Sequence, residues 1–199
     1  MKKLVLAICI GVFAAMSVVT FVQSTQESLE GGVIRLHVRA NSNLTEDQQL
    51  KLKVRDRILA QTKDMAKGVS DVKDAQKLIE DNLPSLKDAA MDEINLHGYN
   101  YPVNIEFGKS KFPARTYGGI TLPAGTYKAL TVNIGTGEGE NWWCVMFPPL
   151  CFTRETVATP DSSSEEMLIE NLGSDTYSML NSGKVQIKFK IYELIKSTR

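Results

Sequence analysis

Apolar and polar side chains alternate along residues 33–40, and a polar turn cluster, Asn41-Ser42-Asn43, follows directly. A period of two is typical of a strand that buries one face and exposes the other. The two predicted faces are Ile34, Leu36, Val38 and Ala40 on the buried side, and Arg35, His37 and Arg39 on the exposed side.

Between residues 45 and 98 the apolar positions recur with the period of amphipathic helices. Thr45 and Gln48 have the spacing of a capping box, which predicts the start of the first helix. Ser70-Asp71 predicts the start of the second, and Pro84 either begins a third or kinks the second. The first helix has an apolar stripe at Leu50, Val54, Ile58 and Met65, with Lys51, Arg55 and Arg57 outside it.

The remaining chain is rich in alternating segments, which predict strands over 103–107, 127–134 and 185–191, and a further strand that holds Trp142 and Trp143. A short helix is expected over Ser162–Asn171, with Gly173 as its stop. The loop Gly135–Gly139 lies between two strands, whereas a phosphate-binding loop precedes a helix, so a flexible hairpin loop is favoured. This order of elements predicts an α+β domain, with a single mixed β-sheet and helices packed on one face.

The N-terminal region has a different pattern, since Lys2 and Lys3 precede a run without charges from Leu4 to Val22. Such a run fits a secretory signal peptide and is also long enough to span a bilayer. The sequence leaves these alternatives open. We therefore expect residues 1–24 to be a signal peptide or membrane anchor, residues 25–32 a linker, and residues 33–199 an exported domain.

Charge and composition exclude several functions. The 199 residues include 23 basic and 23 acidic ones, so no basic excess suggests a nucleic-acid surface. With two histidines and no ligand spacing, we expect no metal and no cofactor. No motif suggests a small-molecule substrate. Cys9 lies in the leader, so an exported chain would keep the pair Cys144 and Cys151, which we expect to form a disulfide.

The segment Asn141–Cys151 holds both tryptophans and the Pro-Pro step. Trp142 and Trp143 should point to opposite faces of a strand, and Trp142 is our choice for the outward ring. Prolines do not fit inside a central strand, so residues 147–150 predict a stiff turn. One interpretation is a core strand followed by a turn. The other is a disulfide-clamped loop that presents an aromatic ridge to a partner, formed by Trp142, Trp143, Phe147, Pro148, Pro149 and Leu150.

No catalytic constellation is apparent in the sequence. Cys144 or Cys151 could act as a nucleophile with a distant histidine, but no local context supports this role. Two alternatives therefore stand beside an exported binding or signalling domain: a secreted cysteine-dependent hydrolase and a structural envelope protein. We expect the protein not to be an enzyme.

Several segments resemble the stage II sporulation protein R family of endospore-forming bacteria. The resemblance runs from Val33 to Phe152 and is carried by Ile34-Arg35, Ala40-Asn41-Ser42, the run from Asp47 to Asp56, Leu122-Pro-Ala-Gly-x-Tyr127, and Asn141–Cys151. It implies an exported signalling protein, without enzyme activity, that crosses the forespore membrane into the intermembrane space.

The resemblance also implies a partner, a membrane-embedded aspartic protease of the mother cell that processes a sigma-factor precursor. Asn41, Lys53 and Asp56 lie in family-like runs, and we expect them to contact this partner. Association of the N-terminal segment with a membrane is a further expectation.

Overall fold

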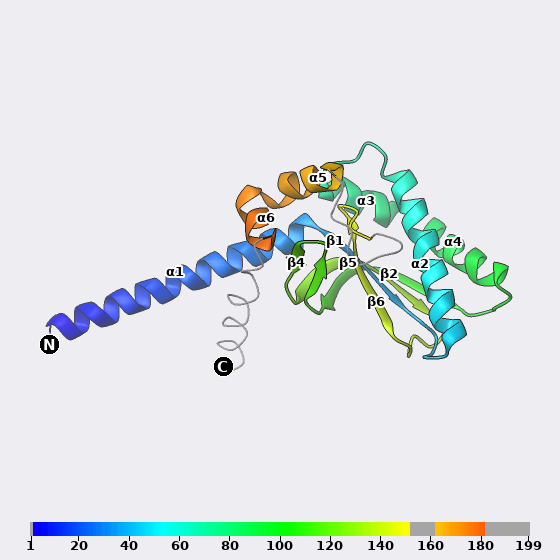
Figure 1. Cartoon of the computed structure of the whole chain (residues 1–199), viewed down its shortest axis with the longest axis horizontal. Coiled ribbons are helices and arrows are strands. Elements are labelled where there is room, and N and C mark those ends of the chain that lie inside the picture. Colours follow the sequence, from blue (N-terminus) through cyan, green and yellow to red (C-terminus); the bar gives the residue numbers. More distant parts are fainter. Residues whose placement is uncertain (1, 152–161, 182–199) are drawn as a thin grey trace.

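The computed structural model describes residues 2–151 and 162–181 (Figure 1), and the strand expected over 185–191 lies outside this range. The described elements are α1 (Lys2–Gly32), β1 (Ile34–Arg39), α2 (Thr45–Met65), α3 (Val72–Asp81), α4 (Leu83–Leu96), β2 (Val103–Phe112), β3 (Arg115–Tyr117), β4 (Ile120–Leu122), β5 (Gly125–Ile134), β6 (Asn141–Phe147), α5 (Ser162–Leu172) and α6 (Ser174–Asn181).

The main sheet has four strands in the order β2-β5-β1-β6. Strand β1 is central, parallel to β5 and antiparallel to β6, while β2 pairs antiparallel with β5. The predicted α+β class and mixed sheet are therefore confirmed. The loop between β5 and β6 is not a hairpin, however, because β1 lies between these two strands.

Both faces of the main sheet are covered, so the prediction of a single sheet with helices on one face is wrong. One face packs under α2, α3 and α4 through residues such as Leu36 and Leu130. A second apolar cluster covers part of the other face. It joins the end of α1, α5, α6 and the separate β3–β4 hairpin. This second layer buries the alternate side of β1, which the sequence pattern predicted to be exposed: Arg35 and His37 are both 0% exposed.

Helix α1 continues without a break into the domain, and the linker expected over residues 25–32 is helical instead. Leu29 is fully buried, and a Cβ on Gly32 would collide with the side chain of Leu172, so α1 packs closely against α5. The N-terminal part of α1 projects away from the domain with apolar side chains such as Phe13 exposed (Figure 1). In the described part of the chain, no helix combines the length and apolar composition needed to cross a membrane.

Helix α2 is fixed at its start by Asp47 rather than by a capping box. Asn41 Nδ2 and Ser42 Oγ donate hydrogen bonds to Asp47 Oδ2 at 2.9 and 2.6 Å. Gln48 Nε2 reaches back to the carbonyl oxygen of Ser42 at 2.8 Å. Leu44 is the N-cap residue and supplies no side-chain hydrogen bond, so the capping-box prediction is wrong.

The same turn holds the loop between β5 and β6. The amide of Thr136 donates to Asn41 Oδ1 at 3.1 Å, and the amide of Gly139 donates to the carbonyl of Ala40 at 2.9 Å. Both ends of the Asn41 amide are therefore used within the domain. A contact between Asn41 and a partner protein stays a prediction, but within the domain Asn41 links the start of α2 to the loop between β5 and β6.

Gly139 should tolerate no side chain, because a Cβ there would collide with the backbone carbonyl of Ser42 and lie 2.8 Å from the Cβ of Ala40. We expect Gly139→Ala to lower the free energy of unfolding in urea by about 1–3 kcal/mol. Gly108→Ala is the matched control, since a Cβ there meets no atom within 4 Å. Equal midpoints for both variants would contradict the close approach of the two loops.

Candidate functional site

The two tryptophans of β6 point to opposite faces of the sheet, as predicted. The Trp142 ring lies beneath α2, with the guanidinium carbon of Arg55 4.1 Å from its centre. The Trp143 ring stacks on the imidazole of His37 on the other face, with ring centres 3.6 Å apart. Both rings are half-buried. Arg55 of α2 covers Trp142 and His37 covers Trp143, so neither ring is the single outward one that was expected for Trp142.

The disulfide between Cys144 and Cys151 is present, as predicted. Its loop folds back onto β6, since the amide of Leu150 donates to the carbonyl of Val145 at 3.2 Å. Phe147 and Leu150 are buried in the two core clusters, and Pro148 is buried beside them, whereas Pro149 is exposed. The expected aromatic ridge is therefore absent from this loop, and its contact with a partner stays a prediction.

Arg35 lies inside an aromatic cage on the second face of the sheet. Its guanidinium carbon is 4.3, 4.9 and 5.6 Å from the ring centres of Phe112, Tyr127 and Tyr117. Nη2 donates to Tyr117 Oη at 2.7 Å, and Nε donates to the carbonyl of Cys144 at 3.2 Å. Nη1 is buried without a hydrogen-bond partner.

The electrostatic effect of this cage acts on all of its ionisable members. Burial lowers the pKa of Arg35 and raises the pKa of Tyr117 and of Tyr127. Each shift favours the form that costs least to desolvate, and the electron-rich ring faces replace the carboxylate that usually accompanies a buried arginine. Because the cage joins β1, β2, β3 and β5, Arg35 fixes the hairpin on the sheet.

His37 lies beside this cage and is a neutral imidazole at pH 7. Its burial lowers its pKa to about 4. Arg39 Nε donates to His37 Nε2 at 3.2 Å, and the amide oxygen Oδ1 of Asn141 lies 2.6 Å from the same nitrogen. The contact with Asn141 favours a proton on Nε2 and so opposes the shift, but burial and the charge of Arg39 outweigh it and keep the pKa low.

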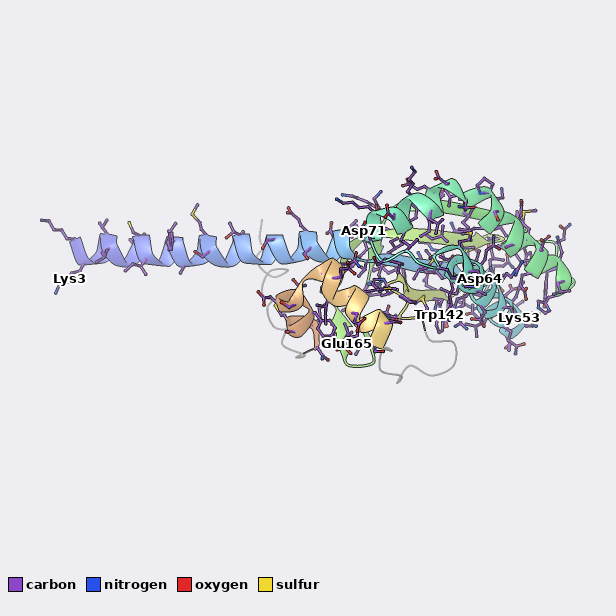
Figure 2. All side chains as sticks on the ribbon, turned by 90° about the horizontal axis from the view of Figure 1, so that it is seen from above. Lys3, Lys53, Asp64, Asp71, Trp142 and Glu165 are labelled. Carbon is purple, nitrogen blue, oxygen red and sulfur yellow. A yellow bond between two sulfur atoms is a disulfide. The ribbon has the colours of Figure 1, made fainter. Side chains whose placement is uncertain are left out.

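Lys53 and Asp56 of α2 were expected to contact the partner, and in the structure they make separate contacts within the domain. Asp56 pairs with Arg55 at 2.7 Å, and Arg55 in turn covers Trp142. Lys53 instead approaches His97 Nδ1 of α4 at 3.2 Å. Figure 2 shows Lys53 toward the end of the domain that lies away from the projecting part of α1, and Trp142 nearer the middle of the domain.

Lys51 and Arg55, which were predicted to lie outside the apolar stripe of α2, are nevertheless buried. Each is 5% exposed, because they lie against Glu140 and Trp142 at the start of β6. Lys51 Nζ donates to the carbonyl of Glu140 at 3.0 Å, and the Arg55 guanidinium lies over the indole of Trp142. Long side chains can bury their stems in this way while keeping a polar contact at the tip.

The described residues do not assemble a metal site, since they contain no group of three or more histidine, cysteine or acidic side chains suited to hold an ion. In this structure the sulfur atoms of Cys144 and Cys151 are bonded to each other, so neither is available as a thiolate nucleophile. The oxidised pair gives no support to a cysteine-dependent hydrolase.

Comparison with known proteins identifies the family. The family model of stage II sporulation protein R matches residues 30–157, which include β1 to β6 and the disulfide. The chain belongs to this family. Stage II sporulation protein R of Bacillus subtilis (strain 168) is 35% identical to it over 162 residues, covering 76% of this chain and 72% of that protein. No solved structure matches. Membership in the stage II sporulation protein R family supports a role in sporulation.

His37 should make the domain sensitive to acid. The folded pKa of about 4 lies below the usual value of 6.5, so the unfolded chain binds the extra proton between these two values. The stability that neutral His37 contributes is complete above pH 6.5 and is lost as the pH falls toward 4. The slope should reach up to about 1.4 kcal/mol per pH unit.

The measurement is urea unfolding at several pH values for the wild-type protein and for His37→Gln, which cannot be protonated in this range. We expect the variant to be less stable at pH 7 and to depend less on pH below 6.5. Parallel pH profiles would show that His37 does not set the acid sensitivity.

Proposed function

We propose that this protein is an exported signal of sporulation. In this proposal it activates a membrane-embedded aspartic protease of the mother cell, which then processes a mother-cell sigma-factor precursor. The family match across the sheet and its disulfide loop is the observation that carries the proposal. The domain acts through binding rather than chemistry, in line with the oxidised cysteines.

The proposed export rests on the N-terminal segment and on the disulfide. Lys2 and Lys3 precede an uncharged run, and many of its apolar side chains are exposed on a helix that leaves the domain. This is the composition of a secretory leader, and disulfides persist in oxidising compartments outside the cytosol. We propose residues 1–24 as the leader and the intermembrane space as the destination.

The packing of α1 limits where such a leader can be removed. Ser28 Oγ donates to the carbonyl of Leu172 at 3.1 Å, and Leu29 is buried in the second core cluster. Loss of the chain before Ser28 would leave these contacts intact, whereas loss of Leu29 would open a cavity beside α5. The processed protein would therefore keep the last turn of α1.

Export can be tested in cells that coexpress the protein, the proposed protease and its sigma-factor precursor. We expect deletion of residues 2–24 to abolish processing, because the domain would stay in the cytosol on the wrong side of the membrane. Fusing an unrelated secretory leader to the same deletion should restore processing. The read-out is the ratio of mature sigma factor to its precursor.

Two controls accompany this experiment. The exported protein, isolated without reductant, should resist thiol alkylation at Cys144 and Cys151, whereas the reduced protein should react at both. Normal processing by the cytosolic deletion would overturn the proposed route of signalling. A structural envelope protein, the alternative function, would leave processing unchanged in every variant.

Charge reversal on α2 tests the predicted partner contacts. We expect Lys53→Glu and Asp56→Lys each to reduce processing at least about tenfold, as loss of a binding contact does, while the melting temperature changes little. Lys67→Glu is the control, because Lys67 lies just beyond the C-terminal end of α2 and its side chain is 75% exposed, so its pairing with Asp64 is a surface contact. Unchanged processing in both α2 variants would limit Lys53 and Asp56 to packing α2 against α4 and β6.

A further inference from the structure

The second face of the main sheet is covered over only part of its length. The end of α1, α5, α6 and the hairpin cover the part around Arg35, Ala129 and Val145. Beyond this part, two rows of paired side chains cross all four strands. In strand order these rows are Asn104, Asn133, Arg39 and Asn141, and then Glu106, Thr131, His37 and Trp143.

These two rows, which we call the open sheet face, are accessible to solvent. Four of their members are exposed, three are half-buried, and His37 is buried beneath its neighbours; the exposed ones are Arg39, Asn104, Glu106 and Asn141. Residues of the alternate positions, such as Val38 and Val132, point into the core under α2–α4. The open sheet face is therefore a continuous polar surface built on rigid strands.

Arg39 is oriented on this surface by the buried imidazole. Its Nε donates to His37 Nε2, while no hydrogen bond or ion pair within the described residues occupies its Nη1 and Nη2. A guanidinium held through Nε presents its two terminal groups as a fork, which matches the two oxygens of a carboxylate. Because His37 is fixed by stacking on Trp143, less motion is lost when the fork binds.

The residues around Arg39 suit a protein surface. Asn133 Oδ1 is buried without a hydrogen-bond partner, and the Asn141 amide is exposed beside Arg39. Asparagine and threonine lose little conformational freedom on binding and can donate or accept. Arginine and tryptophan are the residues that most often dominate binding energy in protein interfaces.

The charge and polarity of the open sheet face argue against a polyanion or a lipid surface as its ligand. It carries one cation, Arg39, and one anion, Glu106, whereas polyanions are bound by clustered basic residues. Its exposed members are all polar, whereas binding at a lipid surface needs exposed apolar side chains. A single carboxylate within a mostly neutral polar surface is the ligand that fits.

We propose that the open sheet face is the docking surface for the partner protein, and that a carboxylate of the partner binds Arg39. This inference rests on the proposed function, since the partner is the membrane-embedded protease. It adds a contact on the side of the sheet opposite α2, with the half-buried Trp143 at its margin.

The test is the processing assay in coexpressing cells, together with thermal melting of each purified variant. Arg39→Gln should reduce processing at least about tenfold, and Arg39→Lys should restore only part of it, because lysine keeps the charge but lacks the fork. Lys87→Gln, an exposed lysine of α4 on the other side of the domain, is the charge-matched control and should process normally.

A second variant guards against an effect of Arg39 on folding. Asn104→Arg adds a bulky cation to the first strand of the open sheet face and leaves Arg39, His37 and the core untouched. It should also reduce processing, with an unchanged melting temperature. Normal processing by both Arg39→Gln and Asn104→Arg, with an active wild-type protein, would overturn the inference. An inactive wild-type protein would instead overturn the proposed function.

A binding measurement distinguishes the two possible ligands of Arg39, a carboxylate of the protease and an anionic lipid. Membrane vesicles that contain the protease should retain more of the wild-type protein than of the Arg39→Gln variant. Vesicles of anionic lipid without the protease measure the binding through the N-terminal helix, which should be equal for the two proteins. Binding to the anionic lipid alone that depends on Arg39 would overturn the assignment of a protein carboxylate.

Discussion

A buried cation without a carboxylate organises the second half of this domain. Desolvating the guanidinium of Arg35 is costly unless other groups replace its water. The structure supplies three ring faces, one phenol and one backbone carbonyl, contributed by β2, β3, β5 and β6. Tyr117 ties the β3–β4 hairpin to this arrangement, because its hydroxyl accepts from Arg35 and also donates to the carbonyl of Trp143 at 3.3 Å. The layer formed by α5, α6 and the end of α1 packs around this arrangement.

The alternation along residues 33–40 was sufficient to predict β1 and its inward face. Pro84 left two possibilities open, and the structure shows the first of them, the start of a third helix. The alternation was not sufficient to predict the second layer. Polar residues at every other position predict a strand face that is exposed to solvent. This face is instead covered, because the rings that surround Arg35 come from residues 77 to 92 positions away in the sequence. Long-range packing of this kind leaves no local pattern, so a buried arginine looks the same as an exposed one.

The candidate site was predictable to a similar extent. Opposite faces for Trp142 and Trp143 follow from strand geometry alone, and the disulfide follows from the even cysteine pair. The prediction of an aromatic ridge was wrong because Phe147 and Leu150 pack into two different core clusters. That packing depends on how the loop folds back across β6. No single segment of the sequence predicts the open sheet face, because each of its rows combines residues from four strands. Only the register of the sheet places Asn104 in one row with Arg39 and Asn141.

The unbroken course of α1 has a mechanical consequence. A helix of 31 residues is about 46 Å long, and its last turn is wedged against α5 and β5. A flexible connection would let the domain rotate freely with respect to whatever holds its N-terminal end. A rigid rod instead ties the direction of the sheet to the direction of that helix. As long as α1 is intact, the domain has few orientations available, and removal of the projecting part would release it to tumble in all directions.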